Sequence, residues 1–210
     1  MIRKNLLLCK IFRIKTSSKS LFDSYMAKFQ PCLETCPICG STGNCHIHDY
    51  YDRSLIDFQS RAPEIYSLCV MRVFCDSCEH AHAVLPDIII PYSVYSLLFV
   101  LRLLGQYFAN LGSIEQLCER FGISQNLFYK WLKLWNSHKQ HWLGVLTDSE
   151  TANLSFWKEL YEQERYSDFS MKFIRSTSYS FLQGHRNPVL QSSKKAHYCQ
   201  TVFAPDSFIF

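Results

Sequence analysis

Hydrophobic and polar positions change their period near residue 90. Residues 44–58 are rich in His, Tyr and Ile, and residues 65–74 (IYSLCVMRVF) are rich in β-branched and aromatic side chains, so the pattern predicts two strands. The polar residues 59–61 separate them, and Pro86 and Pro91 mark the change from strand to helix. Residues 1–31 show no clear period and are expected to form a basic arm, within which Met26 could be the true start.

Helical periodicity follows in three segments. Residues 93–108 are apolar nearly all round and predict a central, buried helix. Ser113 is suited to N-cap a helix over residues 114–121, which Gly122 ends, and Ser124 is suited to cap a third helix that reaches about His141. Beyond Gly144 the pattern predicts two weaker helices, at about 153–164 and 168–182, and then an irregular tail.

Composition excludes some classes of protein. The chain is 48% hydrophobic and 15% aromatic, which excludes wholesale disorder. Residues 88–104 could be mistaken for a membrane span, but polar residues interrupt them, and the clean stretch 97–101 is far below the roughly 20 residues that a span needs. The 10 cysteines could form a secreted disulfide framework, yet no export signal is visible, because Lys10 breaks the short apolar run before it. We therefore expect a cytoplasmic protein with no membrane contact.

The net charge of +4 is unevenly distributed. Residues 1–35 carry +5, residues 36–91 carry −4, residues 92–144 carry +3, and residues 145–210 are balanced. A polyanion should therefore bind mainly at the middle of the chain.

Four cysteines have metal-ligand spacing. Cys36 and Cys39 lie in CPICG, and Cys75 and Cys78 lie in CDSC, with 35 residues between the two pairs. Two residues between cysteines let a tight turn direct both sulfurs at one ion, and two such turns give the closed four-thiolate site of structural zinc. The gap exceeds the usual 15–20 residues, so we predict a zinc ribbon with an enlarged hairpin and one structural Zn²⁺ per chain.

Three alternatives remain at this site. The cysteines could be unrelated free thiols, the ion could be iron, or a nearby histidine could replace a ligand. Zinc is preferred over iron because nothing else in the sequence indicates a redox partner. The histidines near the pairs are otherwise expected to be strand residues with solvated rings: His46, His48, His80 and His82. The remaining cysteines are expected to be small apolar fillers or surface thiols: Cys9, Cys32, Cys45, Cys69, Cys118 and Cys199.

Residues 113–135 fit a helix-turn-helix. Gly122 lies where the turn needs a positive φ, and the small Cys118 lies where the two helices would cross. The third helix has an apolar stripe at helical spacing: Phe128, Trp131, Leu132 and Trp135. Its opposite face carries the residues that we expect to bind DNA: Ser124, Gln125, Asn126, Tyr129, Lys130 and Lys133. Gln and Asn can pair with adenine in the major groove, and residues 124–141 contain three lysines and no acid. The alternative is an ordinary helical hairpin with a solvated polar face.

Together these patterns predict an α+β fold with a small β zinc ribbon, a three-helix helix-turn-helix domain and a helical C-terminal extension. The expected units are a basic arm (1–31), the ribbon (32–90), the helix-turn-helix domain (91–144) and the extension (145–210).

Over residues 32–144 the chain resembles the N-terminal region of bacterial insertion-sequence transposases. The match lies in CPICG, the aromatic hairpin, MRVFCDSC, HAHAVLP and IIPYS. It is similar, more closely, to a bacterial family of transposase-like proteins of unknown function. The resemblance implies a DNA-binding protein of a mobile element, with the four cysteines as zinc ligands and the helix from Ser124 as the DNA reader.

The chain departs from a transposase after Gly144. Only 66 residues follow, too few for a catalytic domain in which three carboxylates hold two metal ions. The acids there are expected to be helix-surface charges: Asp148, Glu150, Glu159, Glu162, Glu164, Asp168 and Asp206. We therefore expect no enzyme activity and no catalytic residues. The expected partner is double-stranded DNA, with a transposase or a second copy of the chain as a further candidate. The alternatives are an accessory subunit that acts with a separate catalytic chain, and a protein-interaction adaptor.

Overall fold

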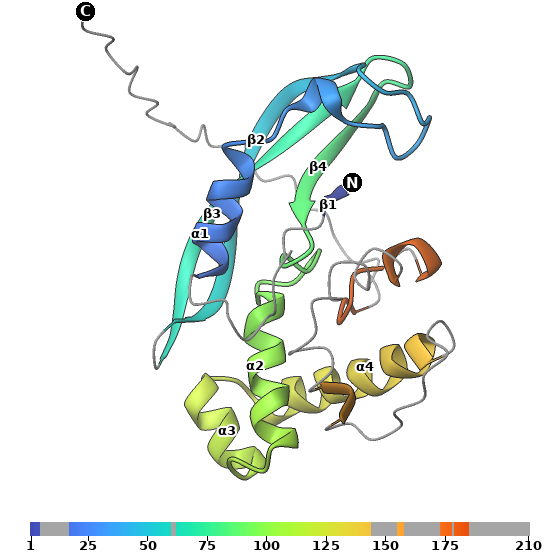
Figure 1. Ribbon diagram of the computed structural model, residues 1–210. Coiled ribbons are helices and arrows are strands. Elements are labelled where there is room, and N and C mark those ends of the chain that lie inside the picture. Colours follow the sequence, from blue (N-terminus) through green and yellow to red (C-terminus); the bar gives the residue numbers. More distant parts are fainter. Residues whose placement is uncertain (5–16, 60–61, 144–154, 158–172, 178, 185–210) are drawn as a thin grey trace, which may run out of the picture.

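The structure is a computed structural model, and it describes residues 1–4, 17–59, 62–143, 155–157, 173–177 and 179–184. Long strands, with one helix beside them, form the upper part of the molecule in Figure 1, and the other labelled helices form its lower part, which confirms the predicted α+β class. In chain order the elements are β1 (Ile2–Lys4), α1 (Ser18–Met26), the 3-10 helix η2 (Pro31–Leu33), β2 (Cys45–Gln59), β3 (Ala62–Cys75), β4 (His80–Pro86), α2 (Leu97–Phe108), α3 (Ile114–Phe121) and α4 (Gln125–Leu143).

One long hairpin organises the four-stranded sheet, whose order is β1-β4-β3-β2. Strands β2 and β3 pair antiparallel along their whole length, with an irregularity between Ile47 and Asp49. Strand β4 pairs only with the last four residues of β3, Arg72 to Cys75, so most of the hairpin extends beyond it as a two-stranded ribbon. Both predicted strands are confirmed, and the cysteine pairs lie at the open end of the hairpin.

Helix α2 is the central helix, as the apolar pattern predicts. Ser96 caps it by accepting a hydrogen bond from the Phe99 backbone N–H at 2.9 Å. The helix begins later than the expected residue 93, because the backbone before it forms hydrogen bonds with the hairpin instead. Val94 and Ser96 form backbone hydrogen bonds with Ile56 of β2, which joins this loop to the hairpin edge.

The main core joins the hairpin to the helices. Phe58 near the hairpin tip stacks on Phe121 of α3, with the ring centroids 4.6 Å apart, and Phe99 of α2 packs edge-on against Phe121. A second, smaller cluster lies near the cysteine end and contains Met71 and Val73. The predicted boundary near residue 90 stays a prediction, although the main core includes residues on both sides of it.

Asp57 is a buried hydrogen-bond acceptor where three elements meet. Its carboxylate is 4% exposed as part of β2 and accepts from the Ser18 backbone N–H of α1 at 2.6 Å. It also accepts from the Ser96 hydroxyl at 2.8 Å and from its neighbour Phe58 N–H at 2.9 Å. One side chain thus fixes the starts of α1 and α2 against the hairpin.

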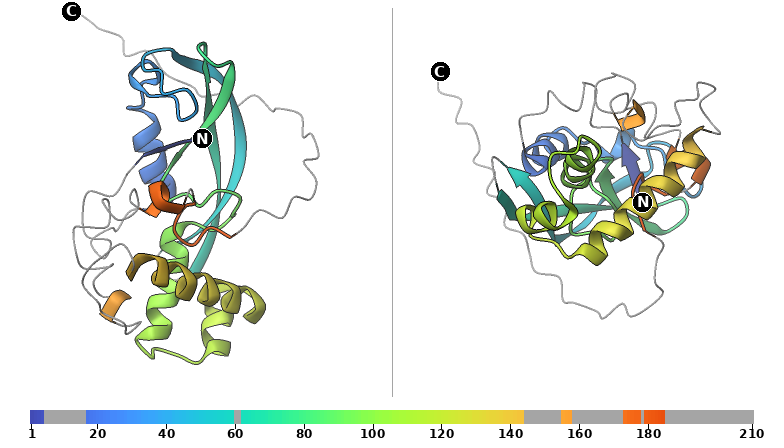
Figure 2. Two further views of the ribbon diagram at one scale, coloured as in Figure 1. Left: turned by 90° about the vertical axis from the view of Figure 1, so that its right-hand side faces the viewer. Right: turned by 90° about the horizontal axis from the view of Figure 1, so that it is seen from below.

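The prediction of an irregular arm over residues 1–31 is wrong for the residues that the structure describes. Ile2 of β1 pairs in parallel with Val84 of β4. Ser17 caps α1 by accepting from the Ser20 backbone N–H at 3.1 Å, and Phe22 of α1 is 1% exposed. Figure 2 shows α1 lying along the hairpin. A protein that started at Met26 would lose all of these contacts.

The C-terminal extension packs against α2 and α4 where it is described. Residues 155–157 and 173–177 are helical, and the rest of the two predicted helices lies mostly outside the described residues. Phe156 and Phe181 pack edge-on against Trp135 of α4, with centroids 5.3 and 5.8 Å away. Trp157 lies against Gly105 of α2, where an added Cβ would be 2.2 Å from the ring. Among the helices described, none is both long and apolar enough to cross a membrane.

Candidate functional site

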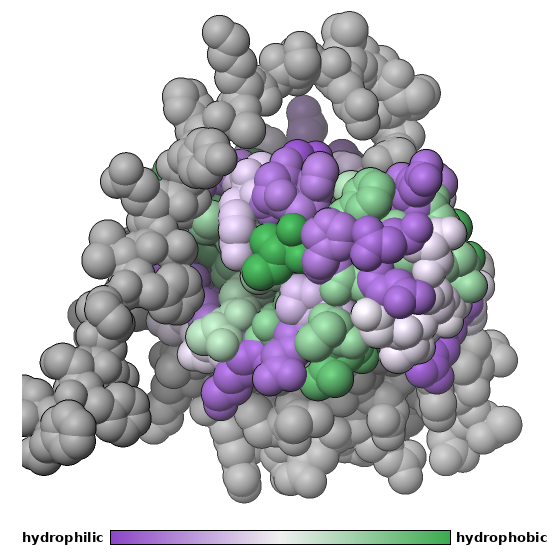
Figure 3. Space-filling view, turned by 90° about the horizontal axis from the view of Figure 1, so that it is seen from above, coloured by the Kyte–Doolittle hydropathy of each residue, from purple (hydrophilic) through white to green (hydrophobic). Residues whose placement is uncertain are grey.

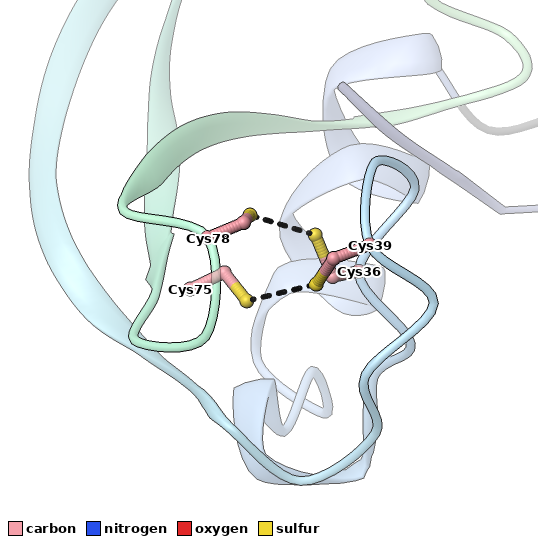
Figure 4. Close-up of side chains that lie close together, drawn as sticks. All are labelled: Cys36, Cys39, Cys75 and Cys78. Atoms are coloured by element: carbon pink, nitrogen blue, oxygen red, sulfur yellow. Dashed lines mark hydrogen bonds between the residues drawn. The ribbon is translucent and has the colours of Figure 1, made fainter.

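The two cysteine pairs lie on facing turns. Cys36 and Cys39 lie in a short loop closed by a hydrogen bond from the Gly40 N–H to the Cys36 carbonyl at 3.0 Å. Cys75 ends β3, and Cys78 lies in the turn before β4. Figure 4 shows the four sulfurs pointing toward one another from these two turns. The hairpin register thus brings together residues that are far apart in the chain.

The sulfur geometry fits one metal ion. All four Sγ atoms lie within 4.8 Å of one another, with 3.6 Å between those of Cys36 and Cys78 and 3.7 Å between those of Cys39 and Cys75. A tetrahedral ion with bonds of about 2.3 Å to sulfur separates its ligands by about 3.8 Å. The cluster can therefore hold a metal ion, and its dimensions are compatible with zinc. It contains four cysteines and no histidine.

Backbone N–H groups favour thiolate at part of this cluster. Burial alone would raise the pKa of the Cys36 thiol, but the N–H groups of Cys39 and Ile38 and the neighbouring thiols lower it to about 5. Burial would likewise raise the pKa of Cys75, and backbone N–H groups of its own turn lower it. Burial and hydrogen bonds with the other three cysteine side chains raise the pKa of Cys78 to about 12. Four adjacent thiolates repel one another, and a divalent cation would offset that repulsion.

His82 is a contact that the sequence reasoning missed. Instead of a solvated ring, it has a side chain that is 2% exposed on β4, so the expectation for this residue is wrong. Its Nε2 lies 3.3 Å from the Sγ of Cys36, and its Nδ1 lies 3.4 Å from the Met1 amino group. The alternation around it (HAHAV) places polar and small residues in turn and gives no sign of which histidine is buried.

The other three histidines near the cysteine pairs lie on the surface. His46 contacts the Asp76 carboxylate at 3.2 Å, and both His46 and His48 pack against the ring of Phe74. His80 is exposed, and its ring bonds the Cys78 carbonyl oxygen at 2.5 Å. These three agree with the expectation of strand residues with solvated rings.

A second missed feature ties the two cysteine turns together. Asn44 donates to the Ser41 hydroxyl at 2.5 Å and to the Ser77 hydroxyl at 2.9 Å. Ser77 also donates to Ser41 at 3.0 Å. Because Ser41 follows the first cysteine pair and Ser77 lies within the second, these bonds hold the turns together without the ion.

None of the remaining cysteines that the structure describes is in a disulfide bond. Cys45 and Cys118 are buried, Cys69 is half-buried and Cys32 is exposed. Burial raises the pKa of the Cys45 thiol to about 11, which keeps it protonated beside the cluster. Cys9 and Cys199 lie outside the described residues.

Helices α3 and α4 meet at a tight turn, and the local signals of the sequence account for it. Ser113 and Gln116 form a reciprocal capping box at the start of α3. Gly122 ends this helix with φ +61° and ψ 39°, a left-handed conformation that glycine adopts without strain. The Ser124 hydroxyl accepts from the Leu127 N–H at 3.3 Å and caps α4. Cys118, 5% exposed, is buried at this junction, as expected.

Helix α4 separates an aromatic face from a polar face. Phe128, Trp131 and Trp135 are at most 4% exposed and pack into the main core. All six residues predicted to bind DNA are exposed, and Tyr129 is 51% exposed: Ser124, Gln125, Asn126, Tyr129, Lys130 and Lys133. The right panel of Figure 2, seen from below, shows α3 and α4 lying across the lower end of the molecule.

The third lysine of α4 does not belong to the polar face. Lys139 is 7% exposed, and its ammonium lies 6.0 Å from the ring centre of Phe156. Burial lowers its pKa. Because Lys139 follows Trp135 by four residues, helical spacing places it on the aromatic face. The basic polar face therefore contains Lys130 and Lys133 only, among the residues whose exposure is described.

Two neighbouring segments border the polar face. Pro63 at the hairpin tip lies beside the α3–α4 turn, where an added Cβ on Gly122 would be 3.9 Å from its ring. Gly184 of the C-terminal extension lies beside Lys130, where an added Cβ would be 3.8 Å from the Lys130 Cε. The face is therefore held in place by the hairpin on one side and by the extension on the other.

Part of the chain is similar to a known protein family. Residues 36–116 are similar to a family described as a domain of unknown function, DUF6431. This match includes both cysteine pairs, the hairpin, β4 and α2, and it ends inside α3 before α4 begins. No curated protein and no solved structure matches the chain.

Proposed function

We propose that this chain is a sequence-specific, non-catalytic DNA-binding protein with one structural zinc ion. The observation that carries the proposal is the polar face of α4, which is exposed, free of acids and held by a tight glycine turn and an aromatic core. The relation to transposases rests on the sequence resemblance over residues 32–144.

The reading role of α4 follows from the chemistry of its first turns. In a helix-turn-helix the N-terminal residues of the second helix meet base edges in the major groove. Gln125 and Asn126 occupy this place, and their amides can each make two hydrogen bonds to adenine. Lys130 and Lys133 lie further along the same face, where ammonium groups reach phosphate or guanine. Ser124 and Tyr129 complete the face with hydroxyl groups.

Charge favours DNA contact at the α4 face over contact at the cysteine end. Residues 36–91 carry −4, and Asp76 and Glu79 are exposed beside the cysteine turns. Figure 1 shows these turns at the top of the molecule and α3 and α4 at the bottom. DNA would therefore be repelled from the cysteine end and attracted to α4.

Zinc is the metal we propose for the cysteine cluster. Four thiolates suit zinc or iron, and nothing in the described residues adds a redox group beside them. Four ligands close the coordination sphere, so the ion would have no position for water or substrate and would act as a structural element. It would stabilise the end of the sheet, where the smaller hydrophobic cluster is the only core described.

A protein-interaction adaptor is the second candidate, because large aliphatic side chains are exposed near the cysteine end. Leu33 is 68% exposed and Ile38 is 59% exposed. Figure 3, which looks onto this end, shows hydrophobic residues separated by hydrophilic ones. Single exposed aliphatic residues are common on protein surfaces, so this observation weighs less than the face of α4.

Selection of bound sequences from random duplex DNA tests the proposal. The zinc-loaded protein should enrich one short motif, and a variant with Gln125→Ala and Asn126→Ala should lose or broaden it. Asn136→Ala is the matched control, because Asn136 is an exposed amide on the same helix, about 15 Å further along at 1.5 Å per residue. Failure of the parent to enrich any motif would contradict the proposal and favour the adaptor.

A further inference from the structure

We propose that His82 is a positioning residue of the metal centre, which donates a hydrogen bond from Nε2 to the thiolate of Cys36. This inference rests on the metal-binding part of the proposed function. His82 does not belong to the group of four sulfurs, but it is the buried side chain that reaches that group from β4.

The geometry of His82 favours this role over simple packing. Its side chain is 2% exposed, so water does not compete for the ring nitrogens. Its Nε2 lies 3.3 Å from Cys36 Sγ, within hydrogen-bond distance for a sulfur acceptor. A buried polar ring without such a bond would carry a desolvation cost. Because the Cys36 sulfur is an acceptor once it is a thiolate, Nε2 must be the donor.

The backbone fixes the direction of the ring. His82 pairs with Val73 in the β3–β4 register, and Val73 precedes Cys75 by two residues on the same strand face. The strand that supplies Cys75 therefore also sets the position of His82. The ring thus connects the β4 strand to Cys36 in the opposite turn, so it fixes the distance between the two cysteine turns.

The hydrogen bond from His82 would stabilise the negative charge of the metal-bound cluster. A divalent cation with four thiolates has a net negative charge in a partly buried site, and N–H donors to sulfur disperse that charge. The donors to Cys36 are the backbone N–H groups of Cys39 and Ile38, the latter at 3.5 Å, and the ring of His82. Loss of a partner that orients a metal ligand typically weakens metal affinity by about 10–100-fold.

The test compares two substitutions in the full-length protein. His82→Phe keeps a planar ring and removes both nitrogens, whereas His82→Gln keeps an N–H donor near the place of Nε2. His48→Phe is the matched control, because His48 lies on the surface of the same sheet and packs on Phe74 without touching a cysteine sulfur. Zinc affinity is measured by competition with a chromophoric chelator. The sulfur-to-metal charge-transfer band is then measured on the Co²⁺-loaded protein.

We expect His82→Phe to bind one zinc about 10–100-fold more weakly and to shift the Co²⁺ charge-transfer band to lower energy. His82→Gln should recover most of the affinity, and His48→Phe should behave like the parent. Parent-like affinity and spectrum in His82→Phe would overturn the inference. Equal losses in the Phe and Gln variants would also overturn it, because the ring shape and not the donor would then matter.

Three further outcomes separate the inference from the proposed function. If His82→Phe does not fold, His82→Gln decides alone, with parent-like affinity supporting the hydrogen bond and a loss of tenfold or more overturning it. If the parent itself binds neither Zn²⁺ nor Co²⁺, the metal-binding part of the proposed function fails with the inference. If the parent binds both ions and the variants match it, only the inference about His82 fails.

Discussion

The effect of Gly105→Ala on the stability of the protein should depend on which residue occupies position 157. Gly105 lies inside α2, and a Cβ there would be 2.2 Å from Trp157 Cζ2 and 2.4 Å from Cε2. Alanine in place of glycine inside a helix normally stabilises a protein by about 0.5–1 kcal/mol. Here the tryptophan ring occupies the place of the methyl group, so Gly105→Ala must displace the ring.

The size of the effect follows from what Trp157 would lose. Its ring is half-buried against α2, and its Nε1 donates to the Leu101 carbonyl oxygen at 3.4 Å. Full truncation of a buried tryptophan costs about 3–5 kcal/mol, so displacing this half-buried ring should cost about 2–3 kcal/mol. After the helix gain, Gly105→Ala should destabilise the parent by about 1–2 kcal/mol. In a Trp157→Ala background the same change should instead stabilise by about 0.5–1 kcal/mol.

The assay is urea unfolding of the zinc-loaded parent, the two single variants and the double variant, followed by far-ultraviolet circular dichroism. The double-mutant cycle then gives the coupling between positions 105 and 157, which we expect to be about 2 kcal/mol. If Gly105→Ala stabilises the parent and the Trp157→Ala variant equally, the ring does not lie against α2, and the described packing of the extension is wrong.

Three further predictions concern the buried carboxylate, the metal and the DNA face. Asp57→Ala leaves three donors without their acceptor and should lower the free energy of unfolding by about 3 kcal/mol, whereas the exposed control Asp52→Ala should change it by less than about 0.5 kcal/mol. Equal urea midpoints for the two would contradict the role of Asp57. Cys78→Ser should abolish the tight binding of one zinc per chain, as measured by metal analysis after dialysis, whereas Cys32→Ser at an exposed free thiol should retain it. Zinc retained by the Cys78 variant would exclude that ligand. Lys133→Ala should weaken binding to all DNA sequences alike and reduce the slope of log affinity against log salt by about one, and an unchanged slope would remove Lys133 from the phosphate contacts.

Local signals made the helical part of the fold predictable. The α3–α4 pair is where each step has a cause within a few residues: Ser113 caps, Gly122 takes a positive φ, and Ser124 caps again. The two turns of the candidate metal site were equally predictable, because the spacing of the cysteine pairs alone indicates them. The two strands of the hairpin were predicted from their composition, and in the structure they pair along their whole length.

Other parts depend on contacts that are distant in sequence. The parallel pairing of Ile2 with Val84 leaves no local pattern, and neither does the burial of His82 beside Cys36. One error had a visible signal. Leu21, Phe22 and Tyr25 follow the capping residue Ser17 at helical spacing, so α1 could have been predicted. The burial of Lys139 is also visible in the sequence, because Lys139 follows Trp135 by four residues and so shares its helix face.

The central claim is that the start of α4 reads base sequence, and the ratio of specific to non-specific affinity tests it most directly. Fluorescence anisotropy at fixed salt would compare the enriched duplex with a scrambled duplex for the parent, Gln125→Ala, Asn126→Ala and the matched control Asn136→Ala. Each of the first two changes should cost about 1–3 kcal/mol on the enriched duplex and little on the scrambled one, while Asn136→Ala should preserve the parent ratio. A ratio that is the same for all four proteins would show that α4 does not read DNA.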